Sequence, residues 1–198
     1  MKLSDQFGQI DIYLFDQLLR GRIAPGMRIL DAGCGFGRNL VYFLREGYEV
    51  YGVDSNPDAI AAVRRLAPGL PAGHFHLESI EEISFPDAFA DVVLSSAVLH
   101  LARDDDQFAS MLRGTWRVLK PGGLLFCRLA SSIGIESKIK QISGRRYLLP
   151  DGSERYLVDE ELLLRLTAEW GGRLADPLKT TVVQDQRSMT TWTVMKNR

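Results

Sequence analysis

The feature that most constrains this chain is a glycine-rich turn, Asp31-Ala-Gly-Cys-Gly-Phe-Gly37. It follows a predicted strand at residues 27–31 and precedes a predicted helix at residues 37–46. Glycines at alternate positions allow a sharp turn and remove the side chains that would keep a ligand away from the backbone. The first turn of the helix presents free N–H groups to the same space. The pattern predicts a strand–turn–helix unit with a ligand site at the turn.

An acidic residue, Asp54, ends the next predicted strand, residues 49–54. A carboxylate at that position can accept hydrogen bonds from both hydroxyls of a ribose. The glycine spacing is Gly-x-Gly-x-Gly, which differs from the Gly-x-Gly-x-x-Gly of nicotinamide dinucleotide sites. Asp31 directly before the turn would repel a pyrophosphate and attract a cationic amine. The turn therefore favours a nucleoside-containing ligand over a dinucleotide.

Strand and helix patterns alternate along the rest of the chain. Further strands are predicted at residues 74–78, 91–96 and 124–129, with helices opened by Pro57, by Asp104 or Asp105, and by Asp159. Two late alternating segments, residues 178–184 and 189–195, predict an antiparallel hairpin at the sheet edge. The expected fold class is therefore α/β, a doubly wound, mostly parallel sheet that binds ligands at the carboxyl ends of its strands.

Composition limits the class of protein. The 198 residues carry 24 basic and 25 acidic side chains, a net charge of −1. This charge balance does not indicate binding to duplex DNA or to an acidic membrane surface. The two cysteines and three histidines show no metal-ligand spacing, so no metal site is predicted. No apolar run reaches the ~18 residues of a membrane span. We expect one cytoplasmic domain over residues 1–198, with an N-terminal docking helix region at 1–24 and an insertion at 131–158.

Together these segments resemble the class I S-adenosylmethionine-dependent methyltransferases, in the small, single-domain form that acts on small molecules. The resemblance implies a seven-stranded Rossmann-like sheet of order 3-2-1-4-5-7-6 with strand 7 antiparallel. It also implies S-adenosyl-L-methionine as cofactor and S-adenosyl-L-homocysteine as product. The matching pieces, in the order of the family, are Ile29-Leu-Asp-Ala-Gly-Cys-Gly-Phe-Gly37, Gly52-Val-Asp54, Phe85-Pro-Asp87, Asp91-Val-Val-Leu-Ser-Ser-Ala-Val-Leu-His100 and Arg117-Val-Leu-Lys-Pro-Gly-Gly-Leu-Leu125.

The resemblance also assigns cofactor contacts by position. The methionine moiety would lie against Asp31 and Gly33, and the ribose hydroxyls would bind Asp54. Glu78 stands where the family more often has an aspartate that bonds the adenine amine. The remaining residues that would shape or line this site are Gly35, Gly37, Ser55, Asn56, Ser79, Ile80, Ser95 and Ser96.

A methyl acceptor that must lose a proton needs a base, and His100 is the candidate, since it lies just past the carboxyl end of the fourth strand. The alternative is that His100 bonds the backbone of its loop. In this family the N-terminal helix and the insertion commonly cover the acceptor. Arg128, at the end of the fifth strand, could bind an acidic substrate group. The predicted acceptor contacts are Tyr13, Arg128, Ser131, Arg146, Tyr147 and Tyr156, with Arg145 beside them.

Three functions stay open on these residues. The first is methylation of a small-molecule acceptor. The second is methylation of RNA or protein, which Arg145-Arg146 favours, but the chain has no basic stripe and no Asn-Pro-Pro-Tyr or Asp-Pro-Pro-Tyr after the fourth strand. The third is a non-catalytic module that binds the cofactor. Folds of this type occur as monomers and homodimers.

Overall fold

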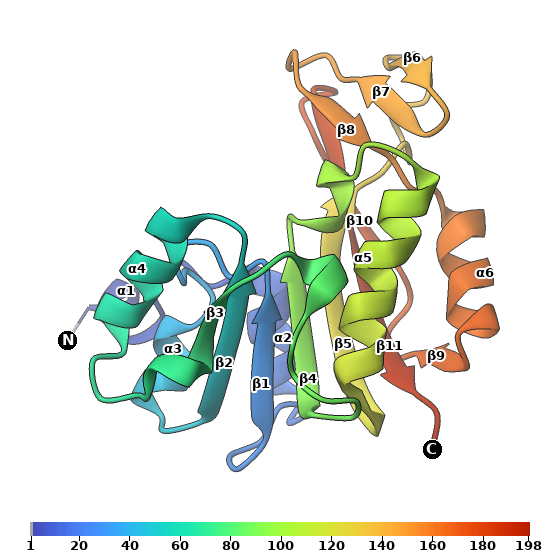
Figure 1. The fold of residues 1–198 in the computed structure, drawn as a ribbon. Coiled ribbons are helices and arrows are strands. Elements are labelled where there is room, and N and C mark those ends of the chain that lie inside the picture. Colours follow the sequence, from blue (N-terminus) through green and yellow to red (C-terminus); the bar gives the residue numbers. More distant parts are fainter. Residues whose placement is uncertain (1) are drawn as a thin grey trace.

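The computed structural model describes residues 2–198 and is organised around one twisted sheet (Figure 1). Its strands follow the order β3-β2-β1-β4-β5-β11-β10, and β9 pairs with β11 beside this path. The strands are β1 (Arg28–Ala32), β2 (Glu49–Asp54), β3 (Phe75–Leu77), β4 (Ala90–Ser96), β5 (Leu119–Ala130), β9 (Gly172–Leu174), β10 (Lys179–Val183) and β11 (Arg187–Lys196). Only β11 runs antiparallel to its neighbours β5 and β10. The predicted order, with one antiparallel strand next to the edge, is confirmed.

Helices cover both faces of this sheet (Figure 1). They are α1 (Leu3–Phe7), α2 (Ile12–Leu19), α3 (Val41–Arg45), α4 (Pro57–Leu66), α5 (Asp105–Val118) and α6 (Glu160–Glu169), with 3₁₀ turns at Ala72–His74, Ile80–Glu82 and Leu99–Leu101. Asp104 and Asp159 cap α5 and α6 by accepting backbone N–H bonds, as their sequence positions predicted. No helix in the described part of the chain is long and apolar enough to cross a membrane.

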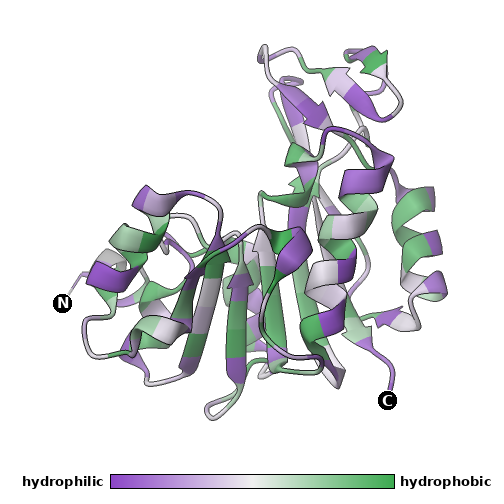
Figure 2. Cartoon of the chain, in the orientation of Figure 1, coloured by the Kyte–Doolittle hydropathy of each residue, from purple (hydrophilic) through white to green (hydrophobic). Residues whose placement is uncertain are grey.

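Strand alternation divides the core into two halves. In β4, Val93 packs with the α5 and α6 side, whereas Val92 and Leu94 pack with the α2, α3 and α4 side. Successive side chains of a strand point to opposite faces, so an apolar run is buried on both. Figure 2 shows this as hydrophobic strands inside and hydrophilic outer helix surfaces. The central strands are therefore covered on both faces, and a ligand can reach them at their carboxyl ends.

Two elements differ from the sequence-based expectation. The helix after the glycine turn covers only Val41–Arg45 rather than residues 37–46, because Gly33, Gly35 and Gly37 all have positive φ and a helix cannot begin among them. The strand predicted at 124–129 begins at Leu119, since the Pro-Gly-Gly segment continues in extended form and pairs across a bulge with β4.

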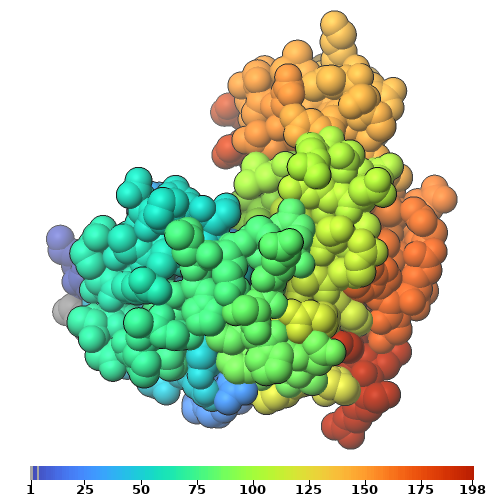
Figure 3. Space-filling view, viewed as in Figure 1, coloured from blue at the N-terminus to red at the C-terminus, as the bar shows by residue number. Residues whose placement is uncertain are grey.

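The insertion at 131–158 forms its own small antiparallel sheet, β6 (Lys140–Ser143), β7 (Arg146–Leu148) and β8 (Glu154–Tyr156). The turn predicted at Pro150–Ser153 joins β7 to β8, and β6 adds a third strand that the sequence did not predict. Figure 3 shows this segment projecting from the body, with the surface indented beside it. The insertion thus stands over the carboxyl ends of the central strands (Figure 1).

Candidate functional site

The glycine turn meets the end of β4 at very close range. A Cβ atom on Gly33 would lie 2.4 Å from Cγ2 of Val98, and Gly33 has a φ of 86°. A Cβ atom on Gly35, by contrast, would meet nothing within 4 Å. Gly33 therefore lets the turn pack on the loop after β4, whereas Gly35 leaves its backbone open to a cavity.

Asp54 is fixed to this turn by two backbone hydrogen bonds. Its Oδ2 accepts from the Gly35 amide at 2.8 Å, and its Oδ1 accepts from the Asn56 amide at 2.9 Å. Each carboxylate oxygen keeps a free lone pair for a ligand hydroxyl. Asn56 itself caps α4 by accepting from the Asp58 amide. The two ends of the predicted ligand site are thus joined before any ligand arrives.

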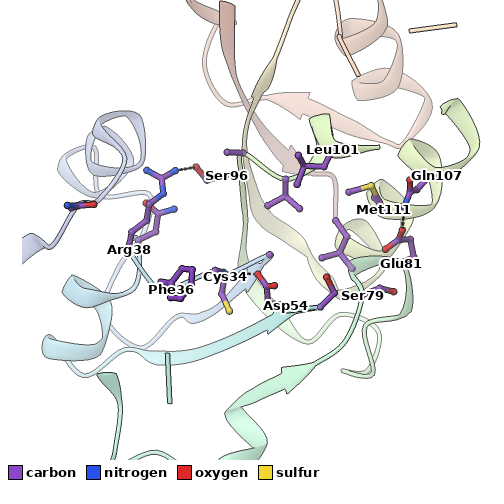
Figure 4. Close-up of a pocket in the computed structure, with 18 residues that line it drawn as sticks. Cys34, Phe36, Arg38, Asp54, Ser79, Glu81, Ser96, Leu101, Gln107 and Met111 are labelled. Atoms are coloured by element: carbon purple, nitrogen blue, oxygen red, sulfur yellow. Dashed lines mark hydrogen bonds between the residues drawn. The ribbon is translucent and has the colours of Figure 1, made fainter. Parts of the chain in front are cut away.

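A cavity of about 660 Å³ opens between the turn and the carboxyl ends of the strands (Figure 4). Seven of the predicted cofactor residues line it: Gly33, Gly35, Asp54, Ser55, Ser79, Ile80 and Ser96. We call this the first cavity. The sequence motif and the cavity therefore coincide.

Five predicted cofactor residues lie outside that lining. Gly37 packs against α4, Asn56 caps it, and Ser95 is fully buried with an unpartnered hydroxyl. Glu78 turns away from the cavity, since its Oε2 accepts from the Ser84 amide at 2.9 Å. Asp31 is the fifth, buried directly before the turn.

Burial raises the pKa of Asp31 to about 8. The positive charge of Arg38 lowers this pKa, and the negative charge of Asp54 raises it further. The carboxyl is therefore largely protonated at neutral pH in the free protein. A cation placed beside it would favour its ionised form. The Asp31 carboxyl is therefore suited to pair with a positively charged ligand group and would repel an anionic one.

The sequence did not indicate several other residues of the first cavity. Glu81 lies on the cavity wall in place of Glu78, and its Oε1 accepts from Gln107 Nε2 at 2.8 Å (Figure 4). Phe36 lines the cavity with 66% of its side chain exposed. Ala97 lines the cavity at the end of the fourth strand, where the family resemblance predicted a channel for methyl transfer. The other unpredicted lining residues are Gln9, Cys34, Arg38, Asn39, Val98, Leu101 and Met111. Gln9, Leu101, Gln107 and Met111 come from segments without a motif, so no sequence signal marked them.

A second cavity of about 360 Å³ adjoins the first, and we call it the second cavity. The two share Arg38, Ser96 and Ala97 as lining residues. Arg38 Nη2 donates to Ser96 Oγ at 2.8 Å across this junction (Figure 4). Ala97 has a φ of 66°, a left-handed conformation that is uncommon away from glycine and often marks functional sites. The end of β4 is thus the place where the two cavities meet.

Arg128 lies in the wall of the second cavity, paired with the N-terminal segment. Its Nη1 donates to Asp11 Oδ2 at 2.7 Å, and its guanidinium lies 5.2 Å from the centre of the Tyr13 ring. The Tyr13 hydroxyl bonds Thr181 at 2.7 Å rather than facing the cavity. The N-terminal docking helix region therefore helps to close this cavity through Asp11.

His100 also lines the second cavity, and its ring accepts a hydrogen bond at Nδ1 from the Ala130 amide at 3.1 Å. A neutral imidazole that accepts at Nδ1 carries its proton on Nε2. The pKa of His100 is lowered to about 4, mainly by burial and to a smaller extent by the positive charge of Arg155. This geometry speaks against the general-base prediction and matches the alternative of a backbone-bonded ring.

The insertion reaches the second cavity through residues other than those predicted. Its lining residues are Leu149, Asp151, Ser153 and Arg155. Tyr156 instead stacks on Phe108 and donates to Asp105 at 2.7 Å. The other predicted contacts are also outside the lining: Ser131 bonds Ser188 and Thr190, Arg145 pairs with Asp159, Arg146 pairs with Glu154, and Tyr147 packs in a small apolar cluster.

Comparison with known proteins gives consistent matches. A family model described as a methyltransferase domain matches residues 30–127. A ubiquinone biosynthesis O-methyltransferase of Methylocella silvestris is 33% identical over 163 residues, which cover 76% of this chain and 62% of the relative. An uncharacterized methyltransferase of Synechocystis is 34% identical over 102 residues, 52% of this chain and 46% of that protein. The chain thus spans less than two thirds of the length of these curated relatives.

Solved structures share the fold over nearly the whole chain. An S-adenosylmethionine-dependent methyltransferase of Methanosarcina mazei has a TM-score of 0.75 at 20% identity, covering 91% of this chain and 97% of that one. The 1,6-didemethyltoxoflavin-N1-methyltransferase of Burkholderia thailandensis, solved with its substrate and S-adenosylhomocysteine, has a TM-score of 0.70 at 21% identity. That match covers 99% of this chain and 81% of that one.

Proposed function

We propose that this chain, which belongs to the class I S-adenosylmethionine-dependent methyltransferases, transfers a methyl group from S-adenosylmethionine to a small-molecule acceptor. The observation that carries the proposal is the pair of cavities that meet at the end of β4. One is built on the glycine turn and Asp54, and the other has the volume of a small-ligand pocket. A transferase needs two sites that share a wall, and this chain has that arrangement.

The residues of the first cavity fit the cofactor. Asp54 has free lone pairs for the ribose hydroxyls, and the open side of Gly35 lets the nucleoside approach the backbone. Ile80 and Met111 offer apolar surface to the adenine ring, and Glu81 offers the carboxylate that the sequence assigned to Glu78. Asp31 lies buried directly before the turn and outside this lining. It is protonated in the free protein, and we propose that its ionised form pairs with the ammonium group of the methionine moiety.

When bound, the cofactor supplies a methyl group already activated by its sulfonium. The protein then has to hold the acceptor in line with that methyl group and keep water away, which can provide most of the rate enhancement. Ser96 and Ala97, common to both cavities, are in position to fix the transfer point. We assign them the positioning role rather than a chemical one.

The carboxylates in the wall of the second cavity accept hydrogen bonds from the protein. The carboxylate of Asp11 accepts from Arg128 and from the Tyr13 amide, and that of Asp151 accepts from Ser153. His100 has its proton on Nε2, so it can donate a hydrogen bond there but not accept one. We therefore propose that His100 takes no proton from the acceptor.

Calorimetric titration with S-adenosylhomocysteine, beside NAD⁺, tests the cofactor. Micromolar binding of the thioether alone is expected, whereas binding of NAD⁺ alone would contradict the proposal. Cell extract is then incubated with the protein and methyl-labelled S-adenosylmethionine, with Asp54→Ala as the control. Label in the low-molecular-weight fraction is expected. Label only in RNA or protein would support that alternative, and cofactor binding without any transfer would support a non-catalytic module.

A further inference from the structure

The second cavity has an excess of positive charge. Four arginines line it, Arg38, Arg128, Arg155 and Arg187, against two aspartates, Asp11 and Asp151. His100 adds no charge at neutral pH, since burial lowers its pKa to about 4. The lining therefore has a net charge of about +2 at neutral pH.

Only part of this charge is neutralised inside the protein. Arg128 is paired with Asp11, whose side chain is 1% exposed. Within residues 2–198, none of Arg38, Arg155 and Arg187 forms an ion pair with a carboxylate. Arg38 donates to Ser96 at the junction, and Arg155 donates from Nη1 to the Glu154 carbonyl oxygen at 2.7 Å. The remaining donors of Arg155 and the guanidinium of Arg187 are therefore left for a ligand.

Arg155 and Arg187 come from different elements but act on the same group. Arg155 lies on β8 of the insertion, and Arg187 begins β11. Asp151 has a lowered pKa, first because Ser153 bonds its carboxylate and also because both of these positive charges act on it. Arg155, Arg187 and Asp151 all belong to the wall of the second cavity.

Apolar side chains also line the second cavity, beside the polar Ser96, His100 and Ser153. Leu149, Val183 and Met189 line the cavity, and Leu149 and Met189 belong to one packed cluster. A wall that combines apolar side chains with a few placed charges is typical of pockets for small organic ligands. The occupant must therefore be amphipathic.

Resting on the proposed function, we infer that the methyl acceptor is a small organic anion. Its carboxylate or phosphate group binds Arg155 and Arg187. Its apolar body packs on Leu149, Val183 and Met189. Guanidinium groups present a planar set of donors that matches either oxyanion, and such charge-assisted bonds are about twice as strong as neutral ones.

The test uses three probes of equal chain length on protein saturated with S-adenosylhomocysteine: hexanoate, hexyl phosphate and neutral hexanamide. Binding is measured by ¹⁵N chemical-shift titration. We expect at least one of the two anions to bind about tenfold or more tightly than the amide, with shifts at residues of the second cavity. The ratio between the two anions then separates a carboxylate acceptor from a phosphate one.

A double variant assigns the effect to the two arginines. Arg155→Gln with Arg187→Gln should weaken anion binding about tenfold or more and leave affinity for S-adenosylhomocysteine within about twofold. The matched control removes two exposed arginines that line neither cavity, Arg45→Gln with Arg113→Gln, and should leave anion binding unchanged. Unchanged cofactor affinity also shows that the double variant is folded.

Three results would overturn the inference. These are equal binding of hexanamide and the anions, no anion binding at millimolar concentration, or an equal loss in the control variant. The probe titrations are repeated without S-adenosylhomocysteine. Failure to bind the cofactor would therefore contradict the proposed function while the anion result stays readable.

Discussion

The two cavities of this chain are built in opposite ways. The first is built around the glycine turn, Asp54 and Ser96 at the ends of β1, β2 and β4, which are neighbouring parallel strands of the sheet. The second is assembled from the N-terminal segment, β5, the insertion and the β10–β11 turn, and long charged side chains dominate its wall. The difference teaches that one site is set by local chain geometry and the other by contacts between distant segments. The predictions that follow test this contrast, from the largest expected effect to the smallest.

The largest effect is expected for Gly33→Ala. A Cβ atom there meets Val98 at 2.4 Å in a left-handed backbone conformation. Strain and overpacking together should lower the free energy of unfolding by about 2–4 kcal/mol. Thermal denaturation should then show a Tm lower by about 5–15 °C. Gly21→Ala, with a φ of 68° and no neighbour within 4 Å, is the control and should cost about 1 kcal/mol. Equal losses would mean that close packing at the turn is unimportant.

Asp54→Ala should remove most of the cofactor affinity while sparing the second cavity. Hydrogen bonds to a charged group contribute about 1.5–3 kcal/mol, so affinity for S-adenosylhomocysteine should fall about 10–100-fold by calorimetry. Asp58→Ala, an exposed carboxylate on α4, is the control and should change it less than about twofold. A loss of hexanoate binding in Asp54→Ala would contradict the separation of the two sites.

Cofactor affinity should depend on pH through Asp31. Its pKa of about 8 in the free protein lies above the ordinary 3.8, so it must lose a proton when an ammonium group binds beside it. Affinity for S-adenosylhomocysteine should therefore rise between pH 5.5 and 7, by up to about tenfold per pH unit. Calorimetry in two buffers of different ionisation enthalpy should show proton release on binding.

Asp31→Asn supplies the check on this assignment, because it removes the titrating group and should flatten the pH dependence. In the free protein the raised pKa also has a stability consequence. The folded state keeps a proton that the unfolded state releases, so unfolding free energy should fall as pH rises from about 4 to about 8. The unfolding free energy of the wild type is compared with that of Asp31→Asn, both without ligand. If the wild type became more stable than the variant as pH rises from about 4 to about 8, the assignment would be refuted.

The smallest effect is expected at His100. Long-range ¹⁵N–¹H correlation spectra should show the Nε2–H tautomer, unchanged between pH 6 and 8. Because its pKa is lowered, this residue should cost stability only as pH falls from about 6.5 towards 4, and His100→Gln should reduce that loss. Titration of the ring near pH 7 would restore it as a candidate base.

Sequence patterns predicted the first cavity because its chemistry is local. The turn, Asp54 and the residues after β3 follow each other at strand ends, and parallel strands bring those ends together. The sequence pointed to Glu78, but two further acidic residues, Glu81 and Glu82, follow within one 3₁₀ turn, and Glu81 is the one that lines the first cavity. Which of them faces the cavity depends on the contacts of that turn with α5, which no local pattern contains.

The second cavity was predicted only in outline. Of six predicted acceptor contacts, Arg128 alone lines it. Tyr156 was predicted as an acceptor contact, yet its ring anchors the insertion on α5. Residues such as Asp11, Arg155 and Arg187 lie far apart in sequence, and their meeting follows from tertiary contacts alone.

The insertion has separate residues for anchoring and for lining the second cavity, and this has a consequence for engineering. The anchoring side chains Arg146, Glu154 and Tyr156 hold the small sheet together and fix it on the body of the protein. The second cavity is lined by positions 149, 151 and 153 in the turn between β7 and β8 and by Arg155 on β8. A combinatorial library restricted to those four codons would explore new acceptors while the anchors and the cofactor motif stay untouched. The insertion would then be the part of the protein in which acceptor specificity can be changed while the glycine turn and Asp54 are kept.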